Sequence, residues 1–114
     1  MSEIEKLYDN AGVETKRGKE ITIDPTTDKV NYHNVYYGYP PFTAEKQLSL
    51  IKFLFNHNVY YDVDDKGNYW FHITDDCYTY YYNKFEIALA NIINEMWQDL
   101  TESEREQIAE ILRR

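Results

Sequence analysis

The residues from Asp62 to Gly67 begin like a calcium-binding loop. Aspartates stand at its first and third positions and a glycine at its sixth, as in an EF-hand loop. Lys66 occupies the fifth position and Ile73 the twelfth, where the cation needs oxygen ligands and above all a bidentate carboxylate. A calcium ion would have too few ligands there. The segment is better explained as a tight turn between two strands, and we expect neither a metal site nor a cofactor.

Histidine and cysteine are the other side chains that could bind a metal or act as a nucleophile. The chain contains His33, His57, His72 and Cys77. Their spacings lack the paired CxxC or HxxxH units that build a tetrahedral zinc site, so we interpret the histidines as structural or surface residues. Cys77 is an unsuitable nucleophile because the aspartates at positions 75 and 76 disfavour its thiolate form. An acid–base pair of His72 with Asp62 or Asp64 is the remaining catalytic alternative, and without a supporting motif we expect a protein that is not an enzyme.

The net charge indicates which kinds of partner the chain can bind. The chain holds 20 acidic and 12 basic residues, a formal net charge of −8. This argues against nucleic acid and anionic membranes, because both attract local excesses of lysine and arginine. The one basic cluster, Lys16 to Lys19, is too short for an oligonucleotide groove, although nearby tyrosines could stack on bases. We therefore expect a partner with a basic surface and no direct contact with nucleic acid or membrane.

The cellular location follows from three features of the sequence. A single cysteine cannot form an intramolecular disulfide, and residues 1–5 lack the basic and apolar segments of a signal peptide. The longest apolar-rich run, Leu48 to Phe55, is interrupted by Ser49 and Lys52 and is far below the ~20 residues that cross a bilayer. These features predict a cytoplasmic protein.

Tyrosine is the most unusual feature of the composition. The chain has 12 tyrosines, and aromatic residues make up 17% of it, which is too much stacking area for a disordered chain. Some tyrosines should lie in the core, but a small sheet cannot bury both faces, so others should be exposed beside aspartates. Tyrosine and tryptophan are enriched in binding hot spots. The candidate partner-binding residues are Tyr60, Asp62, Asp64, Trp70, His72 and Tyr81.

Apolar periodicity and capping residues predict four helices. They are a short helix between Ser2 and Gly12, one from Thr43 to Phe55 or Asn56, one continuous core helix over Lys84–Leu100, and one from Thr101 onward. The second has a wide apolar arc that includes Leu48 and Phe55, so it should be covered on more than one side. The core helix should bury Ile92, Ile93 and Met96. The glutamates of the last helix, at 102, 104, 106 and 110, form a solvated face.

Between Asn58 and Asn83 the period changes to two, which predicts a three-stranded antiparallel meander. Its strands are expected at 59–64, 69–74 and 78–82, with a turn at Asp64 to Gly67. The apolar faces, which include Val59, Tyr61, Val63 and Phe71, should pack on the helices. The opposite face should stay open, and it contains Tyr60, Asp62, Trp70 and His72.

These elements define the expected fold class as α+β. A three-stranded antiparallel meander is packed on one face by about four helices, in the order α-α-β-β-β-α-α. With 114 residues we expect a single domain over residues 1–114. Between residues 13 and 41 the periodicity fails, so this segment should be irregular or form a peripheral hairpin from Ile21–Ile23 and Val30–Tyr32.

Several segments resemble sequences of one group of proteins. They are Ile4 to Val13, Tyr39 to Lys52, Phe85 to Ala90 and Trp97 to Thr101, together about half of the chain. In them the chain is similar to small uncharacterised proteins of phages and prophages in low-GC Gram-positive bacteria. The resemblance implies a phage context and no site residues. Small acidic phage proteins are commonly inhibitors of host defence, including anti-CRISPR and anti-restriction proteins, so the resemblance favours a protein-binding role.

The patterns together predict a non-enzymatic acidic interaction protein of phage origin. It would bind a basic surface of a host protein, such as a CRISPR-Cas nuclease, through its exposed tyrosine and aspartate face, in the bacterial host cytosol. The alternative is a structural or accessory protein that homodimerises through its aromatic sheet face. A stable dimer that buries the tyrosines would favour this alternative.

Overall fold

The computed structural model describes residues 2–13, 17–23, 26–27, 30–36, 39–73, 76–77 and 82–114. These residues form four α-helices, one 3₁₀ helix and five β-strands. In chain order they are α1 (Glu3–Ala11), β1 (Arg17–Ile23), β2 (Val30–Tyr36), α2 (Ala44–Asn56), β3 (Val59–Val63), β4 (Tyr69–Ile73), β5 (Asp76–Cys77), α3 (Phe85–Met96), the 3₁₀ helix η1 (Trp97–Asp99) and α4 (Glu102–Arg113). The α+β class with four helices is therefore confirmed.

The first two helices begin at the caps that the sequence predicts. The Ser2 hydroxyl accepts a hydrogen bond from the Glu5 N–H at 3.2 Å, and Gly12 ends α1 in the left-handed conformation with φ of 70°. At α2 the Thr43 hydroxyl accepts from the Lys46 N–H at 3.3 Å. Each cap satisfies an amide that the first helical turn leaves without an acceptor. Local sequence therefore determines where these helices start.

The core helix α3 differs in part from its prediction. The α-helix ends at Met96, and the next three residues tighten into η1, so the expected helix over Lys84–Leu100 is not continuous. Ile92 and Ile93 are buried as expected, with 2% and 1% of their surface exposed. Met96, the last residue of α3, is only half-buried, contrary to the prediction.

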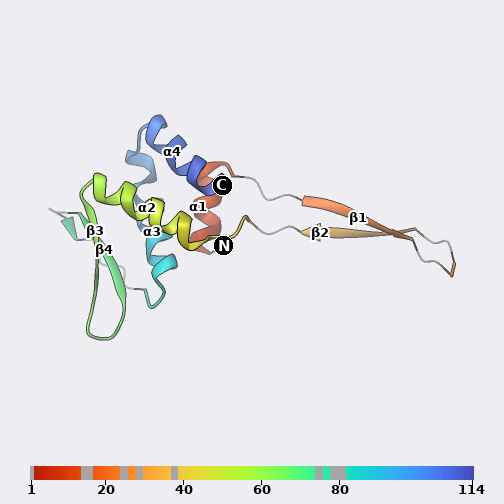
Figure 1. Ribbon diagram of the computed structural model, residues 1–114, viewed down its shortest axis with the longest axis horizontal. Helices are drawn as coiled ribbons and strands as arrows, with labels where there is room; N and C mark the ends of the chain where they lie inside the picture. The colour runs from red at the N-terminus through yellow and green to blue at the C-terminus, as the bar shows by residue number, and fades with distance from the viewer. Residues whose placement is uncertain are drawn as a thin grey trace.

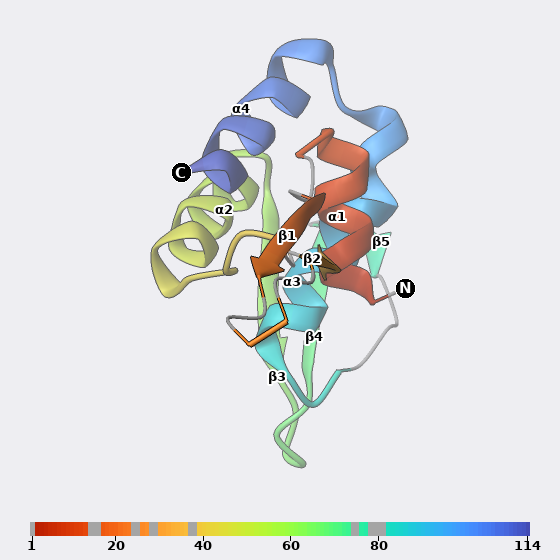
Figure 2. The same cartoon turned by 90° about the vertical axis from the view of Figure 1, so that its right-hand side faces the viewer.

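The helices pack around α3, which contacts α1, α2 and strand β4, while α4 contacts α1 and α2 (Figure 1). The largest fully buried side chains are Tyr8, Leu7, Leu50, Leu54, Leu89, Ile92, Ile93, Ile108, Leu112 and Val59. They come from all four helices and β3, so one apolar core joins the helices to the sheet. Figure 2 shows α2 and α4 side by side.

The apolar arc of α2 is only partly covered. Its buried residues include Leu50, Phe53 and Leu54, whereas Leu48 and Phe55 are exposed, contrary to the prediction. The contacts of α2 with α3, α4 and β3 bury one side of the helix and leave the edges of the arc in solvent. The apolar arc of α2 is wider than the surface that these neighbours bury, so the prediction placed too many of its residues in the core.

A peripheral hairpin follows α1, as expected. Strands β1 and β2 pair antiparallel from Arg17 opposite Tyr36 to Ile23 opposite Val30, and are longer than the sequence predicts. This two-stranded ribbon extends away from the helices (Figure 1). It gives the molecule its long dimension, with extents of 67 × 36 × 22 Å.

The second sheet has the strand order β3-β4-β5. Strands β3 and β4 pair antiparallel from Val59 opposite Ile73 to Val63 opposite Tyr69. The strand predicted at 78–82 falls mostly outside the described residues. In the described part, β4 pairs with the two residues of β5, and Tyr69 forms an isolated bridge with Tyr82. The antiparallel pairing of the first two strands is thus confirmed, and the order of the third stays a prediction.

In the part of the chain that the structure describes, none of the helices combines the length and the apolar run that a bilayer crossing requires.

Candidate functional site

The turn between β3 and β4 fixes the register of the candidate site. Asp64 Oδ1 accepts hydrogen bonds from the N–H groups of Lys66 and Asn68, each at 2.9 Å. The hydrogen bond from the Asn68 backbone is the main reason why the pKa of the Asp64 carboxyl is lowered. Gly67 has φ of 80°, which glycine adopts without strain. Asp64 is therefore part of the turn itself. A shift of the β3–β4 pairing by one residue would break the hydrogen bonds of Asp64 and would exchange the two faces of the hairpin.

One face of the hairpin carries four of the predicted site residues, and we call it the outer face. Tyr60 lies opposite His72, and Asp62 lies opposite Trp70. Directly opposed residues and residues two positions apart on a strand point to the same side. The outer face is therefore made of Tyr60, Asp62, Trp70 and His72.

The outer-face side chains touch one another. His72 Nε2 lies 3.1 Å from Asp62 Oδ2, and the His72 ring lies between Trp70 and Tyr60, with centroid distances of 4.8 and 6.4 Å. The Asp62 side chain is 61% exposed and Tyr60 is 39% exposed. The arrangement combines accessible aromatic area with an accessible carboxylate, which suits protein recognition better than chemistry that needs water to be excluded.

The opposite face of the hairpin, which we call the inner face, packs on the helices. Val59 and Phe71 are buried, as the sequence predicts. The Phe85 ring at the start of α3 contacts the rings of Tyr61, Tyr69 and Phe71, at centroid distances of 5.1, 5.3 and 5.9 Å. Phe85 therefore holds the inner face of the hairpin against the helices.

Two residues of this inner face are exposed, contrary to the prediction. Tyr61 is 39% and Val63 is 51% exposed. The tip of the hairpin extends past the helices (Figure 2), and Val63 is the last residue of β3 before this tip. The predicted faces are correct at the base of the hairpin, while the predicted burial fails toward its tip.

The remaining predicted site residue, Tyr81, lies outside the described residues. Sequence reasoning missed Phe55, because its place in the apolar pattern of α2 indicated core. Its exposed ring lies 5.5 Å from the Tyr60 ring and 6.2 Å from the Tyr61 ring, by centroids. Phe55 thus connects the end of α2 to both faces of strand β3. The only sequence signal for its role was its position shortly before strand β3.

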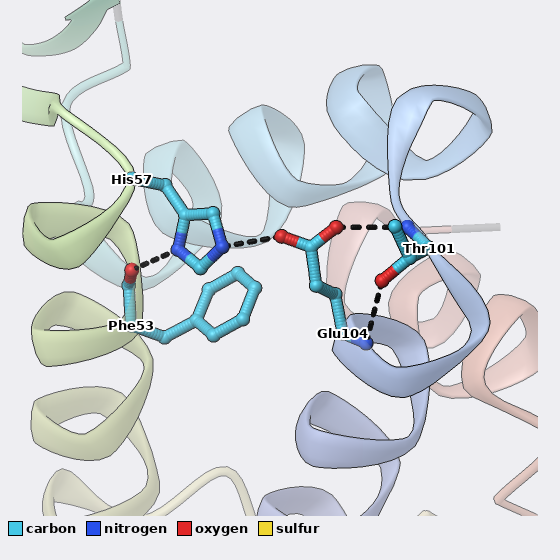
Figure 3. Close-up of polar contacts among 4 residues, drawn as sticks. All are labelled: Phe53, His57, Thr101 and Glu104. Carbon is cyan, nitrogen blue, oxygen red and sulfur yellow. Dashed lines mark hydrogen bonds and ion pairs between the residues drawn. The ribbon is translucent and has the colours of Figure 1, made fainter.

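A second polar group joins the end of α2 to the start of α4 (Figure 3). His57 Nδ1 lies 2.7 Å from the Phe53 carbonyl oxygen, and Nε2 contacts a carboxylate oxygen of Glu104. The His57 ring therefore bridges the last turn of α2 and the first turn of α4. Glu104 was expected in a solvated face and instead holds α4 against α2.

Glu104 is also fixed by the predicted capping box of α4. Its other carboxylate oxygen accepts from the Thr101 N–H at 2.8 Å, and the Glu104 N–H donates to the Thr101 hydroxyl at 3.2 Å. The backbone hydrogen bond from Thr101 is the main cause that lowers the pKa of Glu104, and His57 adds to it. This group joins two helices, so we assign it a structural role.

Among the described residues, no three histidine, cysteine, aspartate or glutamate side chains gather closely enough to hold a metal ion. Comparison with protein-family models, curated proteins and solved structures finds nothing that matches this chain.

Proposed function

We propose that the protein is a non-enzymatic acidic interaction module of phage origin that works in the bacterial cytosol. Its outer face would bind a basic surface on a host protein, such as a defence nuclease. The single observation that carries this proposal is the composition of the outer face, where aromatic rings adjoin the exposed carboxylate of Asp62. The net charge of −8 supports a basic partner, because it accelerates encounter with positive surfaces.

The pairing of His72 with Asp62 also raises the enzymatic alternative. Such a pair could act in acid–base catalysis if a substrate were held beside it. The Asp62 carboxylate is mostly exposed, so water competes for every interaction that it makes, and a flat sheet face offers little to orient a small substrate. These features support binding to a large surface over catalysis.

A homodimer is the second candidate. Among the described residues, strand β3 lies at the edge of its sheet, and its own residues Tyr61 and Val63 are exposed. An open strand edge with apolar neighbours favours pairing with another chain. Size-exclusion chromatography with light scattering shows whether the chain forms a stable dimer. Fluorescence quenching then shows whether the dimer shields Tyr60 and Trp70 from solvent. A dimer that does so would contradict the host-protein proposal.

The decisive experiment uses affinity capture from the lysate of a low-GC Gram-positive bacterium, followed by titration of the purified target. We expect Tyr60→Ala and Trp70→Ala to weaken binding by ~2 kcal/mol or more, about 30-fold, as for interfacial anchors. Leu48→Ala is the matched control, because Leu48 is an exposed apolar residue of α2 outside this face. Equal losses in all three variants, or none, would contradict the proposal.

Charge is tested separately by kinetics. Asp62→Asn should slow association and flatten its salt dependence, because an exposed charge mainly steers encounter. Asp99→Asn is the charge-matched control, since Asp99 is exposed in η1, away from the hairpin. If both variants change the association rate equally, net charge alone is responsible, and the outer face has no specific role.

A further inference from the structure

A cavity of about 180 Å³ lies between the start of α2 and the end of α4. Among the described residues it is lined by Thr43, Glu45, Lys46 and Arg114. The volume suits a small polyatomic ion or one polar group of a larger ligand. The residues come from opposite ends of two helices that lie side by side (Figure 2), and none of them belongs to the outer face.

Lys46 is the unusual member of this lining. Only 5% of the residue is exposed, and no carboxylate in the described part of the chain pairs with its ammonium group. Its Nζ lies 5.9 Å from the centroid of the Tyr8 ring. Burial lowers the pKa of the Lys46 ammonium. Most of this side chain is removed from water and no carboxylate among the described residues offsets its charge, so an anion beside the ammonium group would be favoured.

The start of α2 adds hydrogen-bond donors to the same place. The Thr43 hydroxyl accepts a hydrogen bond from the Lys46 N–H, and the Thr43 carbonyl accepts one from the Gln47 N–H. The N–H groups of Ala44 and Glu45 come before these and have no acceptor among the described residues. Free amides at the first turn of a 13-residue helix carry partial positive charge, which favours an anion.

The other two charged residues of the lining oppose each other. The Arg114 guanidinium lies 3.9 Å from Glu110, and both side chains are more than half exposed, so this surface pair leaves its remaining donors available. Glu45 is exposed and would repel an anion. Lys46 and Arg114 bring two positive charges to the cavity, and the carboxylates of Glu45 and of Glu110, the partner of Arg114, oppose them.

We propose that this cavity is a binding site for one oxyanion group, a phosphate or a carboxylate. The ammonium group of the largely buried Lys46 side chain supplies one positive charge, Arg114 supplies an exposed second donor, and the free amides of Ala44 and Glu45 complete the contacts. The site lies at the opposite end of α2 from the outer face, a length of about 20 Å for its 13 residues. The inference therefore does not depend on the proposed function.

The test titrates the full chain with inorganic phosphate or sodium acetate, against chloride at constant ionic strength. The melting temperature and the amide NMR signals of Ala44 and Glu45 are followed together. We expect a saturable rise of about 5 °C at tenfold excess over the Kd, with both amide signals shifting along the same curve. A response to phosphate alone assigns a phosphoryl ligand, a response to acetate alone assigns a carboxylate, and a response to neither overturns the proposal.

Variants separate binding from general salt effects, which also stabilise proteins. Lys46→Met keeps the length of the side chain and should abolish the saturable response. Lys52→Met is the matched control, because Lys52 is exposed on the same helix, and it should respond like the parent chain. Arg114→Gln, at the exposed end of α4, should raise the Kd without loss of folding. An undiminished response in Lys46→Met would overturn the proposal, whatever the behaviour of Arg114→Gln.

Discussion

Replacing Tyr8 by phenylalanine should stabilise the protein. Tyr8 belongs to α1 and is fully buried, and its hydroxyl has no hydrogen-bond partner among the described residues. Its ring packs on Tyr39 and Phe42, with centroid distances of 5.3 and 6.3 Å. Tyr8→Phe keeps these ring contacts and removes only the unpaired hydroxyl. Most tyrosine hydroxyls in cores are hydrogen-bonded, so the expected sign is the reverse of the common one.

The magnitude follows from the two effects of removing the oxygen atom. An unpaired buried hydroxyl costs about 1–3 kcal/mol, which the variant recovers. The gap left by one oxygen forfeits a few dispersion contacts of about 0.1–0.2 kcal/mol each. We expect the free energy of unfolding to rise by about 1 kcal/mol and the melting temperature by roughly 4 °C.

The assay is urea unfolding of the two proteins, with Tyr39→Phe as the control. The Tyr39 hydroxyl donates a hydrogen bond to the Asp9 carboxylate at 2.8 Å. The same chemical change should therefore lower the free energy of unfolding at Tyr39, by about 1 kcal/mol or less because the pair is exposed. Opposite signs at two neighbouring tyrosines are a sharper result than either value alone.

Alkaline pH gives an independent measurement of the same hydroxyl. Burial raises the pKa of Tyr8 above its ordinary value of 10.0. Below pH 10 the phenol is neutral in both states, but above it the unfolded chain loses this proton first. Stability is therefore lost as the pH rises from the unfolded toward the folded pKa, and Tyr8→Phe should lose less. A Tyr8→Phe protein that is less stable at neutral pH and equally sensitive to alkali would show that the hydroxyl is bonded, and the reasoning would be wrong.

Three further predictions concern the core, the helix contact and metals. Ile92→Ala should lower the free energy of unfolding by ~2–5 kcal/mol, and a loss below ~1 kcal/mol in urea would contradict the placement of the core. Because hydrogen bonds from Thr101 and then His57 lower the pKa of Glu104, its stabilisation is present above the ordinary carboxyl pKa and is lost as the pH falls through the lowered one. Acid unfolding should thus converge for Glu104→Gln and the parent chain at low pH. Millimolar calcium or a chelator should leave the melting temperature unchanged, and a rise of several degrees with calcium would show that residues 62–67 bind it.

Local signals in the sequence predicted the helices and the hairpin turn well. Thr43 caps α2 through a residue three positions away, and Asp64 forms its turn through residues two and four positions away. Such interactions are complete within one short segment, so the residue types there are sufficient to predict them. The alternation along β3 and β4 likewise predicted which residues share the outer face.

Features that depend on distant segments were not predictable in this way. His57 and Glu104 are 47 positions apart, and nothing near either residue indicates that they meet. The exposure of Val63 depends on how far the hairpin extends past the helices, which is a property of the packed molecule. Lys46 has a sequence context typical of an exposed helical lysine, and only its tertiary position buries it.

The same helix pair explains why the two proposed sites can be tested separately. His57 at the end of α2 meets Glu104 at the start of α4, while Lys46 near the start of α2 shares a cavity with Arg114 at the end of α4. These two arrangements require α2 and α4 to run antiparallel. The outer face lies beyond its C-terminal end, and the cavity lies at its N-terminal end. The two sites share no residues, so a substitution in one should not disturb the other. Loss of anion binding and loss of partner binding should therefore occur in different variants.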